Sequence, residues 1–199
     1  MIEKLRLHLS RLFAVLLVLL MCVSKSMWED KAPLVATTLF LLGAVLVGIA
    51  SLGRLWCSLY IAGYKTDHLV TQGPYSISRN PLYFFSFVGL LGVGLSSETI
   101  LMPLIILIAF IAYYPFVVRS EEAELMRLHK TQFEIYMKEV PRFFPEISLL
   151  KEPEEYVVKP VVFRKHIFDA LWFIWIMGIL ETIEGLQEAG IFPTIFKIY

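Results

Sequence analysis

The chain has few of the residues that build disulfide frameworks or metal sites. Its two cysteines, Cys22 and Cys57, lie in or beside apolar segments, with neither CxxC spacing nor a histidine cluster nearby. We therefore interpret them as packing residues and predict no bound metal. The sequence also lacks the GxSxG, HExxH and P-loop motifs, so it gives no support to a hydrolase, a metalloprotease or an ATPase.

An excess of charge of either sign is also missing. The 18 basic and 18 acidic residues give a formal net charge of zero, which does not favour a nucleic-acid partner. What the chain has instead is apolar sequence, since 57% of its residues are hydrophobic, compared with about 45–50% in a typical soluble domain. These residues are concentrated in blocks, which indicates an integral membrane protein surrounded by lipids.

Five apolar blocks approach the roughly 20 residues that a helix needs to cross a bilayer. They cover about residues 8–24, 33–53, 81–97, 99–118 and 167–184. A short turn at 96–98 makes the third and fourth blocks an antiparallel hairpin, and Pro103 and Pro115 predict kinks in the fourth. We therefore predict an all-α fold, a polytopic bundle of about five transmembrane helices.

The remaining segments are assigned from their composition. Residues 1–23 resemble a secretory signal, but no A-x-A cleavage site follows, so we expect a retained span. Residues 119–139 are helical in pattern and end at two prolines, and residues 146–159 are charged and read as a linker. The tail, residues 191–199, is apolar but too short to span, and we expect it at the membrane interface.

Lysine and arginine are distributed unevenly among the connecting segments, which predicts the orientation in the membrane. The N-terminal stretch holds three, segment 54–80 holds three and segment 119–166 holds nine, whereas the opposite side has Lys25, Lys31 and Lys197. We therefore predict that the three basic regions are cytoplasmic. A cofactor pocket built from them would face the cytosol, where soluble cofactors are available.

The fourth apolar block ends at two acidic residues, Glu121 and Glu122. Neighbouring residues on a helix point about 100° apart, so one carboxylate can face a pocket while the other pairs with Arg119 or a lysine. A carboxylate here can bind the ammonium group or the ribose hydroxyls of a nucleotide-like ligand. The alternative is a solvated end of a membrane helix that binds nothing.

A second candidate site lies in residues 69–83, ahead of the third apolar block. Gly73-Pro74 predicts a turn, which leaves backbone donors and acceptors free for a ligand. Tyr75 and Tyr83 can flank a flat ring, although an ordinary interfacial loop with aromatic anchors is the alternative. Arg142, which lies between two prolines, can pair with a substrate carboxylate or with a lipid phosphate.

Taken together, these segments resemble the isoprenylcysteine carboxyl methyltransferase family and the related phospholipid methyltransferases. The matching motifs are Leu69-Val70-Thr71-Gln72-Gly73-Pro74-Tyr75, Arg79-Asn80-Pro81-Leu82-Tyr83, Glu121-Glu122, Phe133…Tyr136 and Val140-Pro141-Arg142-Phe143-Phe144-Pro145. Each motif alone is weak, but their order and spacing make the resemblance specific. It divides the chain into N-terminal transmembrane helices (1–64), a methyltransferase-like core (65–145), and a linker with an additional C-terminal transmembrane helix (146–199).

The resemblance implies an integral membrane methyltransferase that uses S-adenosylmethionine. It implies a cofactor-binding role for Leu69, Val70, Gly73, Pro74, Tyr75, Arg79, Asn80, Tyr83, Glu121, Glu122 and, by a Gly-x-Gly pattern, Gly92 and Gly94. It makes Arg142 and Glu121 the candidate catalytic residues. The chain departs from the family pattern at Asn80, where histidine is commoner, and at Lys130, where many members have glycine. These departures bear on local shape and substrate preference.

The implied reaction is an in-line transfer of a methyl group to a lipophilic or membrane-embedded acceptor. A carboxylate acceptor, as in isoprenylcysteine, would need no general base because it is already ionised near pH 7. A phospholipid amine and a small thiol stay open as alternatives, and so does a non-catalytic membrane scaffold that retains the fold. A transporter is disfavoured because the predicted spans contain few charges. The sequence indicates no oligomeric state.

Overall fold

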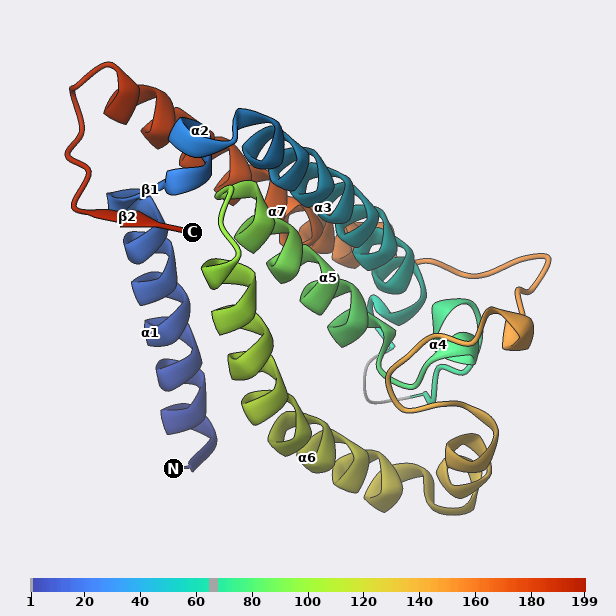
Figure 1. The fold of residues 1–199 in the computed structure, drawn as a ribbon. Coiled ribbons are helices and arrows are strands. Elements are labelled where there is room, and N and C mark those ends of the chain that lie inside the picture. Colours follow the sequence, from blue (N-terminus) through green and yellow to red (C-terminus); the bar gives the residue numbers. More distant parts are fainter. Residues whose placement is uncertain (1, 65–67) are drawn as a thin grey trace.

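The computed structural model describes residues 2–64 and 68–199, with their side chains from Leu12 onward except at position 14. Most of this chain is helical (Figure 1). Proline opens four of the helices, where its fixed φ favours a helix start and its missing N–H is not needed. The elements are α1 (Ile2–Val23), β1 (Ser24–Ser26), α2 (Met27–Lys31), α3 (Pro33–Ile61), α4 (Pro74–Ile77), α5 (Pro81–Ser96), α6 (Leu101–Glu139), the 3-10 helix η1 (Ile147–Leu149), α7 (Pro160–Glu188) and β2 (Phe196–Ile198).

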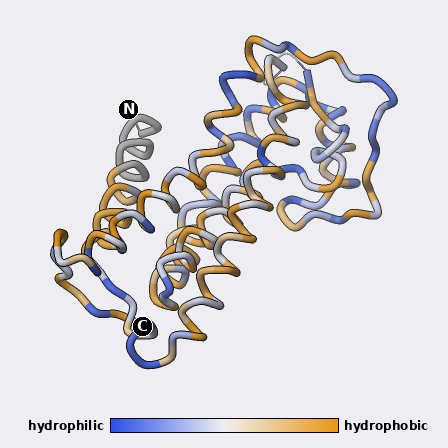
Figure 2. The backbone as a smooth tube through the Cα atoms, turned by 90° about the horizontal axis from the view of Figure 1, so that it is seen from above, coloured by the Kyte–Doolittle hydropathy of each residue, from blue (hydrophilic) through white to orange (hydrophobic). Residues whose placement is uncertain are grey.

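The long helices have the length and composition of membrane spans. Within the described residues, α3, α6 and α7 are long and apolar enough to cross a membrane, and α5 is a shorter apolar helix of 16 residues. Apolar residues follow these helices over much of their length (Figure 2). Large side chains such as Leu41, Ile108 and Trp175 are 57%, 60% and 65% exposed, as expected for surfaces that lipid covers. The prediction of an all-α, polytopic bundle is confirmed.

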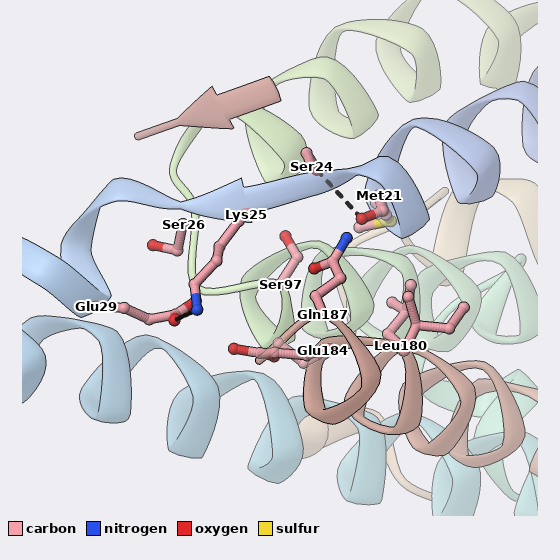
Figure 3. A pocket seen from close by; sticks show the side chains of 11 residues that line it. Met21, Ser24, Lys25, Ser26, Glu29, Ser97, Leu180, Glu184 and Gln187 are labelled. Atoms are coloured by element: carbon pink, nitrogen blue, oxygen red, sulfur yellow. Dashed lines mark hydrogen bonds and ion pairs between the residues drawn. The ribbon is translucent and has the colours of Figure 1, made fainter. Parts of the chain in front are cut away.

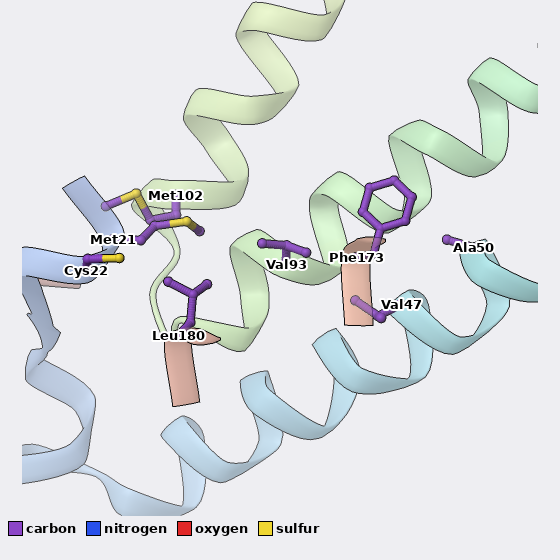
Figure 4. Close-up of a cluster of buried hydrophobic side chains, with 8 residues drawn as sticks. All are labelled: Met21, Cys22, Val47, Ala50, Val93, Met102, Phe173 and Leu180. Carbon is purple, nitrogen blue, oxygen red and sulfur yellow. The ribbon is translucent and has the colours of Figure 1, made fainter. Parts of the chain in front are cut away.

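One buried apolar cluster joins five of the helices (Figure 4). Its members come from α1, α3, α5, α6 and α7 and are Met21, Cys22, Val47, Ala50, Val93, Met102, Phe173 and Leu180. Both cysteines are free and buried, which agrees with the packing role predicted for them. Because every long helix contributes to this core, the helices form a single bundle.

Glycine allows α5 to lie close to its neighbours. A Cβ atom on Gly92 would lie 2.8 Å from the carbonyl oxygen of Gly43 in α3. A Cβ atom on Gly94 would lie 2.9 Å from the backbone nitrogen of Pro103 in α6. Gly92 and Gly94, to which the resemblance gave a cofactor-binding role, therefore pack against neighbouring helices in this structure.

Helix α6 joins the fourth apolar block and the following polar helical region into one element. It is interrupted at Lys130, whose backbone is non-helical (φ 43°, ψ −117°). The helix bends along its length toward the end of the bundle that holds α4 (Figure 1). Phe133, Tyr136 and Val140, which follow the interruption, are buried together. The bend therefore brings the polar half of α6 under the loops at this end.

Replacing Lys130 by glycine should stabilise the protein. The backbone of Lys130 lies at positive φ, which costs a residue with a side chain about 1–3 kcal/mol and glycine little. Part of this gain is lost to the greater freedom of glycine in the unfolded chain, so we expect a net gain of about 1 kcal/mol. Thermal unfolding in detergent measures it. The matched variant Lys138→Gly, in regular helix, should lower stability by about 1 kcal/mol, and a loss in both variants would contradict this account.

The C-terminal tail is tied to the N-terminal part of the chain. Strand β2 pairs in parallel with β1. Lys197 forms an ion pair with Asp30 at 2.8 Å, and the ring of Tyr199 meets that of Trp28 with centroids 5.1 Å apart. Nothing in the sequence indicated this pairing, because three-residue strands carry no detectable pattern. The tail that we expected at the membrane interface therefore also closes one end of the bundle.

Candidate functional site

Two motif segments far apart in sequence lie side by side at the end of the bundle that holds α4. Three consecutive residues donate hydrogen bonds to carbonyl oxygens of the second segment. The Ser78 hydroxyl donates to residue 143 at 3.0 Å, and the Arg79 backbone N–H donates to residue 141 at 2.8 Å. The Asn80 side-chain amide donates to residue 142 at 2.9 Å. The backbone N–H of Glu146 donates to the carbonyl of Ile77 at 2.9 Å. Asn80, which replaces the commoner histidine, thus uses its amide to hold the segment that carries Arg142.

The loop ahead of α4 is fixed by contacts from two other segments. The backbone N–H of Gly73 donates to the carbonyl of Lys151 at 2.8 Å, and that of Lys151 donates to the Ser76 hydroxyl at 2.9 Å. The Tyr136 hydroxyl donates to the carbonyl of Tyr75 at 2.6 Å. Gly73 has φ +58°, a conformation that other residues rarely adopt. The loop is therefore a built part of the structure rather than a solvated connection.

Glu122 is held between two guanidinium groups. Arg79 Nη1 lies 3.0 Å from one carboxylate oxygen, and Arg142 contacts both oxygens, with Nη2 at 2.8 Å and Nε at 3.2 Å. Glu122 and Arg79 are nearly buried, whereas the Arg142 side chain is 53% exposed. Glu122 thus pairs with Arg79 and Arg142 instead of Arg119 or a lysine as predicted. Because both arginines oppose its charge, Glu122 links its own motif to those that carry Arg79 and Arg142, and it does not face an empty pocket.

Glu121 has a different environment, although it is the next residue. It accepts a hydrogen bond from the Tyr83 hydroxyl at 2.7 Å. Among the described residues, no basic group lies within ion-pairing distance of its carboxylate. The two adjacent carboxylates therefore have different partners in the structure, Tyr83 for Glu121 and two arginines for Glu122. The prediction that they play different roles stays a prediction.

Aromatic rings surround the segment that carries Arg142. The ring of Phe143 lies 4.7 Å from that of Tyr114 and 5.6 Å from those of Phe84 and Phe110, centroid to centroid. Tyr114 in turn lies 6.0 Å from Tyr83. These rings come from the first turns of α5 and the middle of α6. They form an aromatic wall beside the ion pairs.

A cavity of about 440 Å³, lined by both polar and apolar side chains, opens between the loop ahead of α4 and the polar half of α6. A cavity of this volume can hold a small organic ligand. Of the residues predicted to bind cofactor, Leu69 lines it. The other lining residues were not predicted to bind the cofactor. Most of them carry hydroxyl, amide or charged groups and three are apolar: Thr71, Gln72, Ser76, Gln132, Tyr136, Glu139 and Lys151, with Ile135, Val140 and Leu149.

The remaining predicted residues take part in packing. Val70 and Tyr75 contact a buried cluster around Tyr60 and Cys57, and Pro74 is buried at the start of α4. Tyr75 is 7% exposed, and its hydroxyl has no hydrogen-bond partner among the described residues. Burial raises the pKa of this phenol, so the hydroxyl stays protonated and can act as a hydrogen-bond donor. An unpartnered buried hydroxyl is unusual and fits a ligand-binding position.

A second pocket lies at the opposite end of the bundle (Figure 3). Oxygens of the carboxylates of Glu29, Glu98 and Glu184 lie within 4.8 Å of one another. Lys25 pairs with Glu29 at 2.7 Å and lines the same pocket. Burial and the charge of Glu29 raise the pKa of Glu98 above its usual value. The three glutamates are far apart in sequence, so sequence reasoning, which predicted no metal, could not group them.

Comparison with known proteins identifies relatives of two kinds. A profile of the phospholipid methyltransferase family matches residues 32–132, which include α3, α4, α5 and most of α6. This range holds the loop ahead of α4 and both glutamates, and it ends before Arg142. No solved structure matches the chain.

Two curated proteins are similar over nearly the whole chain. The nickel-cobalt-cadmium resistance protein NccN of Alcaligenes xylosoxydans xylosoxydans is 35% identical over 189 residues, which are 95% of this chain and 87% of that protein. The cobalt-zinc-cadmium resistance protein CzcN of Cupriavidus metallidurans is 34% identical over 175 residues, which are 87% of this chain and 79% of that protein. These names state a resistance phenotype and no reaction.

Proposed function

Because the chain belongs to the phospholipid methyltransferase family, we propose that it is a membrane enzyme that transfers a methyl group from S-adenosylmethionine to a lipophilic acceptor. The observation that carries the proposal is the convergence of three motif segments at one end of the bundle, with Glu121 left without a basic partner. The excess of lysine and arginine in the segments at this end supports a cytoplasmic position.

The residues present suit the cofactor. S-adenosylmethionine carries a sulfonium and an ammonium group, and the Glu121 carboxylate, oriented by Tyr83, can bind either cation. The buried hydroxyl of Tyr75 supplies a further hydrogen-bond donor. When bound, the cofactor supplies the electrophilic methyl carbon. Glu122 acts through Arg79 and Arg142, because its two ion pairs fix the segments on either side of the site.

The part of the site beside Arg142 suits an acceptor that has an apolar chain and a polar reacting group. The aromatic wall around Phe143 can hold an apolar chain and exclude water from the reacting atoms. Aligning and desolvating two reactants can supply about 7–11 kcal/mol of a barrier. Arg142 is half exposed beside this wall and can orient an acceptor carboxylate or phosphate. We favour a carboxylate acceptor, with a phospholipid amine or a small thiol as the alternatives.

Calorimetric titration of S-adenosylmethionine into the detergent-purified protein tests the proposal. We expect saturable binding that Glu121→Gln weakens at least about tenfold, since a charge-assisted hydrogen bond contributes roughly 1.5–3 kcal/mol. The matched variant Glu124→Gln, on an exposed part of α6, should bind normally. Loss of binding in Glu139→Gln but not in Glu121→Gln would indicate that the cofactor binds in the cavity between the loop ahead of α4 and α6. No binding by folded wild-type protein would favour a scaffold that keeps the fold without the activity.

The relatives and the second pocket together favour a second candidate function, divalent cation binding. Both curated relatives are named for resistance to metals that include cobalt and cadmium, and a set of carboxylate oxygens suits the harder of these two ions, cobalt(II), rather than cadmium. Glu29, Glu98 and Glu184 would be the ligands, with Lys25 displaced from Glu29. Titration with cobalt(II) should then raise the unfolding temperature of the wild type but not that of Glu184→Gln. An equal shift in both proteins would rule out this pocket.

A further inference from the structure

Arg54 is a largely buried cation whose protein partners are all neutral. It lies in α3, which continues two turns beyond the predicted end of its span at residue 53. One Nη donates to the hydroxyl of Ser86 in α5, and the other donates to the carbonyl oxygen of Asp169 in α7 at 2.9 Å. The guanidinium carbon lies 5.6 Å from the ring centroid of Phe173. Arg54 thus joins three helices through neutral hydrogen-bond acceptors, and the carboxylate of Asp169 acts on it only from beyond ion-pairing distance.

The absence of an acidic partner distinguishes Arg54 from the other arginines of the core. Within the described residues, no carboxylate lies within 4.0 Å of its guanidinium, and the Asp169 carboxylate instead faces His166 at 3.4 Å. A guanidinium has five N–H donors, and the described residues supply two acceptors. Its Nε is buried and has no partner. Removing a cation from water without an ion-pair partner is costly, so the site favours an added anion.

Arg54 lies near the end of the helix bundle that holds α4. Ser86 lies five residues into α5 and Asp169 nine residues into α7, so at 1.5 Å per residue the site is about 7–13 Å inside the helix starts. Above this level the helices are apolar, and below it α7 presents the exposed Arg164 and Lys165. Basic side chains between membrane helices bind lipid head groups.

We propose that Arg54 binds the phosphate group of an anionic phospholipid at the junction of α3, α5 and α7. The Asp169 side chain is 68% exposed, so the junction reaches the outer surface of the bundle. The planar guanidinium suits a phosphate, which can accept two parallel N–H bonds. This site is separate from Glu121 and does not depend on methyltransferase activity.

Native mass spectrometry of the full chain, with phosphatidylglycerol or phosphatidylcholine added, tests this inference. The wild type should retain one phosphatidylglycerol in preference to phosphatidylcholine, and Arg54→Gln should reduce that occupancy at least about tenfold. Arg127→Gln, which removes an arginine paired with Glu124 on the surface of α6, is the matched control and should retain the lipid. Equal occupancy in wild type and Arg54→Gln would overturn the proposal.

Two further measurements separate the site from a structural role. If Arg54 only braces the helices, its loss lowers the unfolding temperature but leaves the stabilisation by added phosphatidylglycerol unchanged, which would also overturn the proposal. Should Arg54→Gln fail to fold, Arg54→Lys keeps the charge and should retain the lipid several-fold less well than the wild type. Inorganic phosphate at millimolar concentration should not displace the lipid, and displacement would assign the site to a soluble anion.

Discussion

Replacing Glu122 by glutamine is expected to destabilise the protein by about 3 kcal/mol. The substitution leaves the guanidinium of Arg79 buried without its carboxylate, and breaking a buried ion pair typically costs about 3–5 kcal/mol. We expect the lower end of that range because Arg142, which is 53% exposed, can turn toward water. Denaturant or thermal unfolding in detergent measures the loss. The same variant should weaken S-adenosylmethionine binding indirectly, since it frees the segment that carries Arg142.

The control for Glu122→Gln lies two residues further along the same helix. Glu124 forms an ion pair with Arg127 at 2.6 Å, but both side chains are more than half exposed. Exposed pairs contribute about 0–1 kcal/mol, so Glu124→Gln should leave stability nearly unchanged. Similar losses in the two variants would mean that the buried pairs contribute no more than a surface pair. The contrast with Glu121→Gln is also informative, because that variant should lose cofactor affinity without losing stability.

Replacing Gly73 by alanine is expected to have a comparably large effect, a loss of about 3 kcal/mol or more. Two costs add at this position. The backbone (φ 58°, ψ −131°) is one that residues with a side chain rarely adopt, which costs about 1–3 kcal/mol. A Cβ atom would also lie 2.4 Å from the ring of Tyr60, which is itself buried, and overpacking a core costs about 1–3 kcal/mol more.

Gly190→Ala separates these two costs. Gly190 also has positive φ (+72°), but a Cβ atom there would meet nothing within 4 Å. This variant should lose only the backbone contribution, about 1 kcal/mol. Thermal unfolding of both variants under one set of conditions gives the difference. If Gly73→Ala were no worse than Gly190→Ala, Tyr60 would have room to move and the loop ahead of α4 would be less rigid than we describe.

The sequence by itself determined the class of the protein and much of its local structure. Apolar blocks long enough to span a bilayer leave few alternatives to a helical membrane bundle, because every backbone polar group in lipid must be satisfied within the chain. The blocks predicted from about residues 33 and 81 begin at prolines that are the first residues of α3 and α5. The order of the motifs between Leu69 and Pro145 indicated the family, which the comparison confirms for residues 32–132. All of these are local or compositional signals.

Only the tertiary structure decided which of the candidate side chains act together. The sequence offered two adjacent carboxylates and several arginines, but it could not assign the partners, because pairing depends on where α6 bends and how the segment after residue 140 folds back. The structure pairs Glu122 with Arg79 and Arg142 and leaves Glu121 with Tyr83. It also turns Gly92 and Gly94 toward helix contacts.

The same reason accounts for the features that no sequence pattern indicated. The cavity under the loop ahead of α4, the three glutamates at the opposite end and the neutral hydrogen-bond partners of Arg54 each combine residues from several elements. Periodicity and motifs report on neighbours along the chain, within a turn of helix or a loop. Whether a charge is compensated depends on all the groups within a few ångströms of it in space, and only the packed helices bring those groups together.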